Sequence, residues 1–274
     1  MARIPLVLPF TFDPGQSQKM TDTFADRHIL VTGASTGIGR ATARLIARRG
    51  ARVSLVARRR TILDEAVAEI EASGGTATAI SADVSDKAAL HEAVDAAEAA
   101  FGPIDALYAN AGIGGAFAPF ADYSDAMFDH VLRTNLYSAF WSMKRVLPAM
   151  IARGKGAILV TGSLASERGM AFNPGYVASK HGLLGLARAA ALEAAPRGVR
   201  VNCIIPGFID TPLLENIDHA AAESLRKIVP QGRIGSAEEL AEVAAFLLSD
   251  AASHVTGQSW AVDGGVLGTL AVGG

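Results

Sequence analysis

Residues 28–49 read HILVTGASTGIGRATARLIARR, a run that joins a strand pattern to a helix pattern through glycines. The apolar segment 28–32 is typical of a strand buried on both faces. Apolar residues then recur at helical spacing over 38–49 and stop at Gly50, a residue suited to ending a helix. This stretch therefore predicts a strand, a glycine-rich turn and a helix in direct succession.

The same alternation of short apolar runs and longer amphipathic segments continues along the chain, which is the pattern of a parallel sheet covered by helices. Strands are expected at 28–32, 52–57, 76–81, 104–109, 157–161, 199–204 and 259–262. Helices are expected at 38–49, 62–72, 87–101, 125–152, 174–195 and 237–248. The sequence predicts a single-domain α/β protein with a Rossmann-type, doubly wound parallel sheet of about seven strands and helices on both faces.

Two segments break this rhythm. Residues 1–26 show no periodicity and are interpreted as an irregular N-terminal extension to a domain at 27–274, with Met20 as an alternative start. Prolines interrupt the apolar run near the N-terminus, which argues against an export signal. The segment 208–235 is longer than an ordinary strand-to-helix connection, and it is expected to form a lid over the substrate.

Composition excludes several classes of protein. The 274 residues carry 25 basic and 27 acidic side chains, so the formal charge of −2 argues against a nucleic-acid partner. No apolar stretch has the length of a membrane helix. The single cysteine, Cys203, is expected to be a buried thiol in a reducing, cytoplasmic protein, and six scattered histidines predict no metal site.

The turn after the first expected strand carries Gly33, Gly37 and Gly39. Backbone amides at such a helix start bind the pyrophosphate of a dinucleotide. The spacing Gly-x-x-x-Gly-x-Gly differs from the usual dinucleotide fingerprint and lacks the Gly-Lys-Ser/Thr ending of a triphosphate loop. A tight turn without a ligand is the alternative interpretation.

The end of the second expected strand carries Arg58, followed by Arg59 and Arg60. A carboxylate here binds the ribose 2′-hydroxyl of NAD(H), whereas a guanidinium suits the 2′-phosphate of NADP(H). The sequence therefore favours NADP(H), with NAD(H) possible; a solvated basic helix start is the alternative. Asp83, after the third strand, is expected either to contact the adenine or to cap a helix.

Tyr176 and Lys180 are four residues apart in a helical pattern and so share one face. A phenol titrates near pH 10, and a nearby ammonium ion favours its ionised form. We therefore expect a poorly solvated Lys180, with help from an oxidised nicotinamide ring, to lower the pKa of Tyr176. Ser163 follows the fifth strand and Asn135 lies in the preceding helix, both near the strand ends where open parallel sheets bind ligands.

These residues together resemble the compact branch of the short-chain dehydrogenase/reductase family over residues 26–268. Residues 32–39 match its cofactor turn, and Asn110-Ala111-Gly112 match its Asn-Asn-Ala-Gly element, except that Ala109 replaces the first Asn and puts one sheet hydrogen bond in doubt. Ser163, Tyr176, Lys180 and Asn135 match its catalytic set. Further matches are Pro206-Gly207 with Thr211, and the C-terminal Val262-Asp263-Gly264-Gly265.

The resemblance implies direct hydride transfer between a nicotinamide and a carbonyl compound (a ketone or an aldehyde) or a (secondary) alcohol. Tyr176 would be the general acid/base, Ser163 would bind the substrate oxygen, Lys180 would also bind the nicotinamide ribose, and Asn135 would hold a water in a proton relay. It further implies a homotetramer or homodimer. The cofactor-binding set expected from motif and resemblance is Gly33, Ser35, Thr36, Gly37, Ile38, Gly39, Arg58, Asp83, Val84, Asn110, Ala111, Gly112, Tyr176, Lys180, Pro206, Gly207, Ile209 and Thr211.

Other functions stay open. A non-catalytic dinucleotide sensor on the same scaffold is one, and a hydrolase using Ser163 is disfavoured because this serine lies outside a Gly-x-Ser-x-Gly elbow. Substrate identity is not decided among sterols, small diketones, sugars and acyl thioesters. An apolar pocket is expected from Phe172, Phe208, Ile209, Leu213 and Leu214, with Arg168 as a candidate contact for an anion.

Overall fold

The computed structural model of the protein describes residues 23–212, 214 and 219–269. Seven parallel strands form one sheet in the order β3-β2-β1-β4-β5-β6-β7. The order reverses beside β1, so the predicted doubly wound sheet is confirmed. The strands are β1 (His28–Thr32), β2 (Arg52–Ala57), β3 (Thr76–Ser81), β4 (Ala106–Ala109), β5 (Gly156–Thr161), β6 (Val199–Pro206) and β7 (Ser259–Val262).

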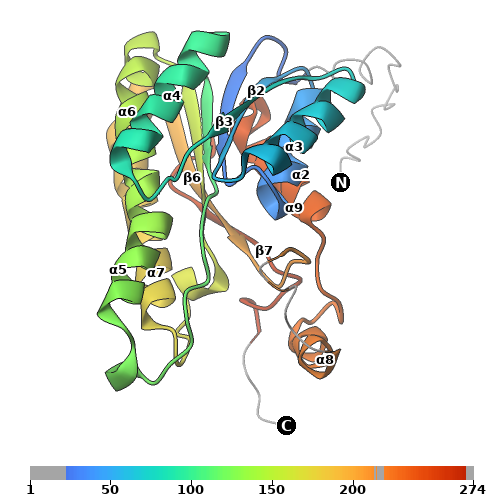
Figure 1. Cartoon of the computed structure of the whole chain (residues 1–274), viewed down its shortest axis with the longest axis vertical. Helices are drawn as coiled ribbons and strands as arrows, with labels where there is room; N and C mark the ends of the chain where they lie inside the picture. The colour runs from blue at the N-terminus through green and yellow to red at the C-terminus, as the bar shows by residue number, and fades with distance from the viewer. Residues whose placement is uncertain (1–22, 213, 215–218, 270–274) are drawn as a thin grey trace, which may run out of the picture.

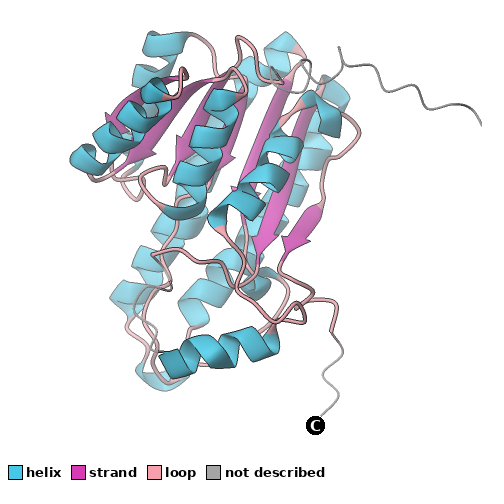
Figure 2. Ribbon diagram, turned by 90° about the vertical axis from the view of Figure 1, so that its right-hand side faces the viewer, coloured by secondary structure: helices cyan, strands magenta, loops and turns pink. Residues whose placement is uncertain are grey.

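Helices cover both faces of the sheet, as Figures 1 and 2 show. One layer holds α2 (Gly37–Arg48), α3 (Arg60–Ala72) and α9 (Ala237–Leu248). The other holds α4 (Lys87–Phe101), α6 (Ser138–Arg153) and α7 (Pro174–Ala194), with α5 (Asp125–Leu132) leading into α6. None of the helices in the described part of the chain is long and apolar enough to cross a bilayer.

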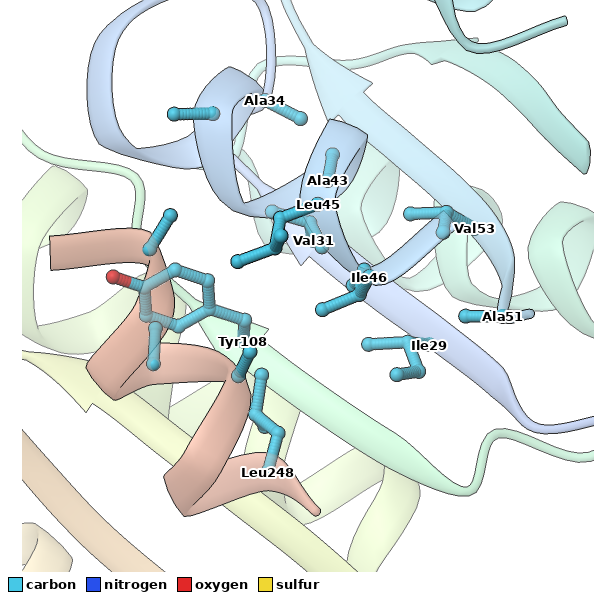
Figure 3. Packing of buried hydrophobic residues seen from close by; sticks show 14 of the residues in the cluster. Ile29, Val31, Ala34, Ala43, Leu45, Ile46, Ala51, Val53, Tyr108 and Leu248 are labelled. Carbon is cyan, nitrogen blue, oxygen red and sulfur yellow. The ribbon is translucent and has the colours of Figure 1, made fainter. Parts of the chain in front are cut away.

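Each face of the sheet has its own hydrophobic core. Ile29 and Val31 of β1 point toward α2 and α9, where they lie with Ile46 and Leu248 in one fully buried cluster (Figure 3). Leu30, between them, belongs to the core on the opposite face. Because β1 is buried on both sides, its sequence is continuously apolar instead of alternating.

The long helix expected at 125–152 is divided. Between α5 and α6, residues Arg133–Tyr137 form a π-helical turn that contains the buried Asn135. A π turn adds a residue to the helical repeat and is frequent at functional sites. Helical periodicity predicted the helix but not this interruption.

The expected lid at 208–235 is more regular than predicted. It contains a helix, α8 (His219–Ile228), which lies beyond the carboxyl ends of the strands (Figures 1 and 2). Its base is fixed, because Gly235 N–H donates to the Phe208 carbonyl and Asp210 N–H donates to the Gly235 carbonyl. Leu213, expected to line the pocket, lies outside the described residues.

The packed domain begins before the expected boundary at residue 27. Phe24 is fully buried, and its N–H donates to the carbonyl of Arg49 at 2.9 Å. It belongs to the same core cluster as β1 and α2. Residues 1–22 of the expected extension lie outside the described residues.

His28, at the start of β1, gives the fold a pH dependence. Its Nδ1 lies 2.8 Å from the Gly102 carbonyl and its Nε2 lies 2.9 Å from the Ser54 hydroxyl, so Nδ1 carries the proton and Nε2 accepts. Burial lowers the pKa of this imidazole below its ordinary value. The unfolded chain then binds more protons than the folded one, and the free energy of unfolding should fall as the pH drops below about 6.5.

Urea titrations at pH 7.5, 6.5, 6.0 and 5.5 measure this dependence. The His28→Gln variant should show a flatter decline than the wild type. The matched control is His181→Gln, which replaces a histidine exposed on α7 instead of a buried one. Identical profiles for wild type and His28→Gln would contradict the assignment.

Candidate active site

A cleft of about 520 Å³ opens at the carboxyl ends of the strands. Every residue predicted to bind the cofactor or to act in catalysis lines it, apart from Gly39 and Asn135. Sequence reasoning missed several lining residues next to the recognised motifs: Ala57, Ala82, Ile113, Thr134, Thr161, Gly162 and Pro212.

The glycine turn leaves an open cradle at the start of α2. Gly33 and Gly37 have φ of +66° and +56°, a region that favours glycine. A Cβ on Gly39 would lie 2.3 Å from the Gly33 carbonyl oxygen, so only glycine fits where the helix meets the turn. Thr36 makes no side-chain cap and the first turn of α2 has no acidic residue, which leaves its N–H groups available to an anion.

Asn110 joins the ends of three neighbouring strands. Its Nδ2 donates to the carbonyls of Thr32 (3.2 Å) and Gly33 (3.3 Å), and its Oδ1 accepts from the Thr161 hydroxyl (3.0 Å). Ala109, in place of the family's first Asn, is buried within β4 and pairs with Thr32 and Val160. These bonds of Asn110 tie β1, β4 and β5 together beneath the cleft.

Cationic side chains lie at the β2 end of the cleft. Arg58 and Arg59 line it and are exposed, whereas Arg60 is paired with Asp64 at 2.8 Å. The Asp83 carboxylate accepts hydrogen bonds from the N–H and hydroxyl of Ser85. Partial burial opposes its ionisation, but these bonds and the Arg58 charge outweigh it and lower the pKa of this carboxyl.

Asp83 does not cap α4, because that role belongs to Asp86, whose side chain accepts from Ala88 and Ala89 N–H. Of the two interpretations of Asp83, the helix cap is therefore wrong. Asp83 lines the cleft from the loop after β3.

Tyr176 and Lys180 lie on the same face of α7, as their spacing predicted. The Lys180 Nζ is 5.6 Å from the centre of the Tyr176 ring and donates to the Thr161 carbonyl at 2.6 Å. Lys180 is 4% exposed, and burial lowers its pKa to about 8. It therefore carries its charge at neutral pH beneath the phenol.

The lowered pKa expected for Tyr176 with a bound nicotinamide is not found in the chain by itself. Burial raises the pKa of this phenol above its ordinary value, and a hydrogen bond with the Ser163 hydroxyl opposes the rise. The Lys180 ammonium lies against the ring and is directed at Thr161, so it does not reverse the effect of burial.

Ser163 is held in place by its own backbone turn. It caps the short helix Leu164–Ser166, with its hydroxyl accepting from Ala165 N–H at 3.2 Å and its N–H donating to the Ser166 hydroxyl at 3.1 Å. A Cβ on the preceding Gly162 would lie 2.7 Å from the Cys203 sulfur, which is fully buried as predicted. The serine hydroxyl thus has a fixed position opposite Tyr176.

Asn135 connects the loop after β4 to α7. Its Oδ1 accepts from Ile113 N–H at 2.8 Å, and its Nδ2 donates to the Ile113 carbonyl (2.9 Å) and the Ser179 hydroxyl (3.1 Å). The polar residue that interrupts the long helix is thus also the residue that holds the cleft wall beside Lys180. A water relay through Asn135 stays a prediction.

Asn173 is a positioning residue that the sequence analysis missed. It is 1% exposed, caps α7 by accepting from Tyr176 N–H (3.2 Å), and donates to the Gly114 carbonyl (2.7 Å). The Tyr123 hydroxyl lies 3.4 Å from its Oδ1. An Asn directly before a Pro at the start of a helix is an N-cap signal that would have identified it.

The fold and this cleft define a dinucleotide-binding oxidoreductase, and comparisons with known proteins agree. A family model described as enoyl-(acyl carrier protein) reductase matches residues 33–267. Cyclohexanol dehydrogenase of Acinetobacter sp. (strain SE19) is 41% identical over 245 residues, covering 89% of this chain and 96% of that protein. Levodione reductase of Leifsonia aquatica is 40% identical over 255 residues, with the same coverage.

Solved structures give the same result. The crystal structure of levodione reductase has a TM-score of 0.87 and 39% identity, covering 90% of this chain and all of that one. A protein described as an NAD(P)-dependent gluconate 5-dehydrogenase from Beutenbergia cavernae, with NADP bound at low occupancy, has a TM-score of 0.85 and 39% identity over 90% of this chain and all of that one. The chain belongs to the short-chain dehydrogenase/reductase family, and it is an enzyme of the kind that acts on CH–OH groups.

Proposed function

We propose that this enzyme interconverts a ketone and a secondary alcohol with NADP(H), and that Tyr176 is its general acid/base. One observation carries the proposal: Ser163 and Tyr176 line the same cleft, and the buried Lys180 Nζ lies 5.6 Å from the centre of the Tyr176 ring. The relatives are named for the oxidation of an alcohol and the reduction of a ketone, which supports this reaction class.

The residues of the cleft fit a dinucleotide. The start of α2 has free N–H groups where a pyrophosphate would bind. At Gly39 the helix lies so close to the Gly33 carbonyl that only glycine fits. Arg58 and Arg59 supply positive charge at the end of β2. When bound, NADP(H) supplies the hydride that reduces the carbonyl, or accepts it from the alcohol.

The chain's own residues handle the proton and the substrate oxygen. Ser163 donates a hydrogen bond to that oxygen and stabilises the negative charge that develops on it during reduction. Tyr176 then gives its proton to the same oxygen, and in the oxidation direction it takes the proton back. Its raised pKa in the chain alone keeps the phenol protonated, which suits a proton donor.

Lys180 acts beside the Tyr176 ring. Its charge lies close to the phenol ring, so a phenolate formed after proton transfer has a cation nearby. The bond from its Nζ to the Thr161 carbonyl fixes the ammonium at the end of β5. We further propose that Lys180 binds the nicotinamide ribose and that Asn135 orders a water that renews the Tyr176 proton.

The test is a spectroscopic assay at 340 nm with NADPH or NADH and a set of ketones, and in reverse with NADP⁺ or NAD⁺ and secondary alcohols. Turnover that requires both a nicotinamide and a carbonyl or alcohol supports the proposal. Saturable cofactor binding without turnover of any ketone or alcohol in a broad set would favour the alternative, a non-catalytic dinucleotide sensor.

Arg58 carries the expected preference for NADP(H). The Arg58→Asp variant should lose affinity for NADPH by about 10- to 100-fold and gain affinity for NADH, since a carboxylate repels the 2′-phosphate and binds a 2′-hydroxyl. Fluorescence titration of both cofactors measures the change. Arg60→Asp is the control, because Arg60 is paired with Asp64 and does not line the cleft; an unchanged ratio in Arg58→Asp would contradict the assignment and favour NAD(H).

We also propose a homodimer or homotetramer. Tyr137 and Phe140, on the π turn and the adjoining α6, are 42% and 43% exposed. Exposed apolar side chains on neighbouring helices are typical of subunit interfaces.

A further inference from the structure

We propose that the substrate is a neutral compound with an apolar body, and that the enzyme discriminates against carbonyl substrates that carry a carboxylate, a phosphate or an acyl carrier protein. This inference rests on the proposed function, whose reaction class leaves the rest of the substrate undefined. Its basis is the distribution of charge and apolar surface around Ser163 and Tyr176.

The charged side chains that line the cleft are not placed to hold an anionic substrate. They are Arg58, Arg59, Asp83 and Lys180. The first three follow β2 and β3, at the end assigned to the adenosine, and Lys180 is buried and bonded to the Thr161 carbonyl.

Among the residues that the structure describes, the cleft wall around the reacting hydroxyls has no ionisable side chain other than Tyr176 and the buried Lys180, which is bonded to the Thr161 carbonyl. The described residues that form it are Ile113, Gly114, Gly162, Ser163, Tyr176, Pro206, Gly207 and Ile209. An anionic group placed here would lose hydration without gaining a counter-charge, which is unfavourable.

Of the basic residues described in the segments beside this part of the cleft, three are engaged elsewhere. Arg168, expected as an anion contact, donates from its guanidinium to the Leu267 carbonyl at 3.0 Å. In the segment after β6, Arg226 is paired with Glu223, and Arg233 with Glu239. Lys227, on α8, is exposed and does not line the cleft.

Two loops beside the cleft carry exposed apolar side chains instead. Phe117 and Phe120 follow β4 and are 70% and 82% exposed; Met170 and Phe172 precede α7 and are 37% and 60% exposed. We call these four residues the apolar rim.

Hydrogen bonds join the two loops of the apolar rim to each other and to the wall of the catalytic cleft. Ala118 N–H donates to the Phe172 carbonyl at 2.9 Å, and Asn173 Nδ2 donates to the carbonyl of Gly114, a residue of the cleft wall, at 2.7 Å. Phe172 lies four residues before Tyr176 and has a φ of +67°, an unfavourable conformation for a phenylalanine. Strained backbone of this kind persists where the surroundings fix it, and it is concentrated at functional sites.

Uncharged walls and an apolar rim favour a neutral ring or chain over a charged one. A carboxylate or phosphate would have no basic partner there, and an acidic carrier protein would meet aromatic side chains where it needs basic ones. We therefore expect the charge of the substrate, and not only its size, to control kcat/KM.

Two ketones with the same ring and reacting carbonyl test this with the full-length enzyme and NADPH: cyclohexanone and 4-oxocyclohexanecarboxylate. We expect kcat/KM to be at least tenfold higher for cyclohexanone. Acetoacetyl-coenzyme A, a charged acyl thioester, should be reduced more slowly still. Equal or higher kcat/KM for either anionic substrate would overturn the inference while leaving the proposed function intact; no reduction of any ketone would overturn both.

Variants of the apolar rim connect this preference to named residues. Phe172→Arg should narrow the ratio of kcat/KM between the two cyclohexanones by about tenfold, because it supplies the missing counter-charge. Phe117→Ala should raise KM for cyclohexanone several-fold with little effect on kcat. Leu192→Ala, which removes an equally exposed apolar side chain from α7, is the control and should change neither.

NADPH titration and circular dichroism show whether these variants keep the fold and the cofactor site. A Phe172→Arg variant that binds NADPH normally but leaves the ratio unchanged would count against the apolar rim as the determinant. If Phe172→Arg fails to fold, the Phe117→Ala variant tests whether the apolar rim binds the substrate. An unchanged KM for cyclohexanone in Phe117→Ala would overturn that role of the apolar rim.

Discussion

Replacing Tyr176 by phenylalanine should lower kcat by about 10²- to 10⁴-fold, the usual contribution of a positioned general acid/base, and should leave NADPH affinity within a few-fold. The substitution removes one hydroxyl and keeps the ring that packs over the Lys180 ammonium. Single-turnover kinetics with saturating NADPH and a reducible ketone measure the loss in the chemical step directly.

The control for this experiment is Tyr137→Phe, since Tyr137 is 42% exposed and does not line the cleft. It should retain wild-type kcat. If Tyr176→Phe also retains it, another group donates the proton, and the assignment of Tyr176 fails even though the family membership stands.

A single methyl group on Gly39 should remove most cofactor binding. The added Cβ of Gly39→Ala would lie 2.3 Å from the Gly33 carbonyl oxygen and 2.6 Å from the Asn110 Nδ2. Relief requires movement of the backbone that forms the cradle, and overpacking of this kind costs typically about 1–3 kcal/mol. We expect the dissociation constant for NADPH to rise about 10- to 100-fold and Tm to fall.

Gly185→Ala provides a matched comparison. Gly185 lies inside α7 with no atom within 4 Å of an added Cβ, so the same change should leave NADPH binding intact and raise stability by about 0.5–1 kcal/mol. Isothermal titration with NADPH and thermal unfolding cover both variants. Wild-type affinity in Gly39→Ala would show that the turn does not hold the dinucleotide.

The strands of this protein were predictable because most of them are buried on both faces. β1, β2, β4 and β5 read as nearly continuous apolar runs, which differ from the amphipathic helices between them. The glycine turn, Ser163, Tyr176 and Lys180 were predictable because strand ends gather at one edge of a parallel sheet. Local sequence signals were sufficient for these features.

Features that depend on several distant residues were not predictable. The π turn depends on bonds from Asn135 to Ile113 and Ser179, residues 22 and 44 positions away. The pKa of Tyr176 depends on how deeply the phenol is buried and on where Lys180 directs its ammonium, which spacing along a helix does not reveal. α8 was missed because the segment was judged by its length, although its alanines and Leu225 are compatible with a helix.

Asn173 has a consequence for how this enzyme can acquire new substrates. One buried amide both caps the helix that carries Tyr176, the proposed proton donor, and is bonded to Gly114 in the loop that lines the cleft. A mutation that reshapes that loop to admit a bulkier ketone will also disturb the start of α7. We therefore expect variants that accept larger ketones to have a slower chemical step. Directed evolution toward larger ketones should therefore recover its lost rate through compensating changes at Tyr123 or Gly115, the neighbours of this amide.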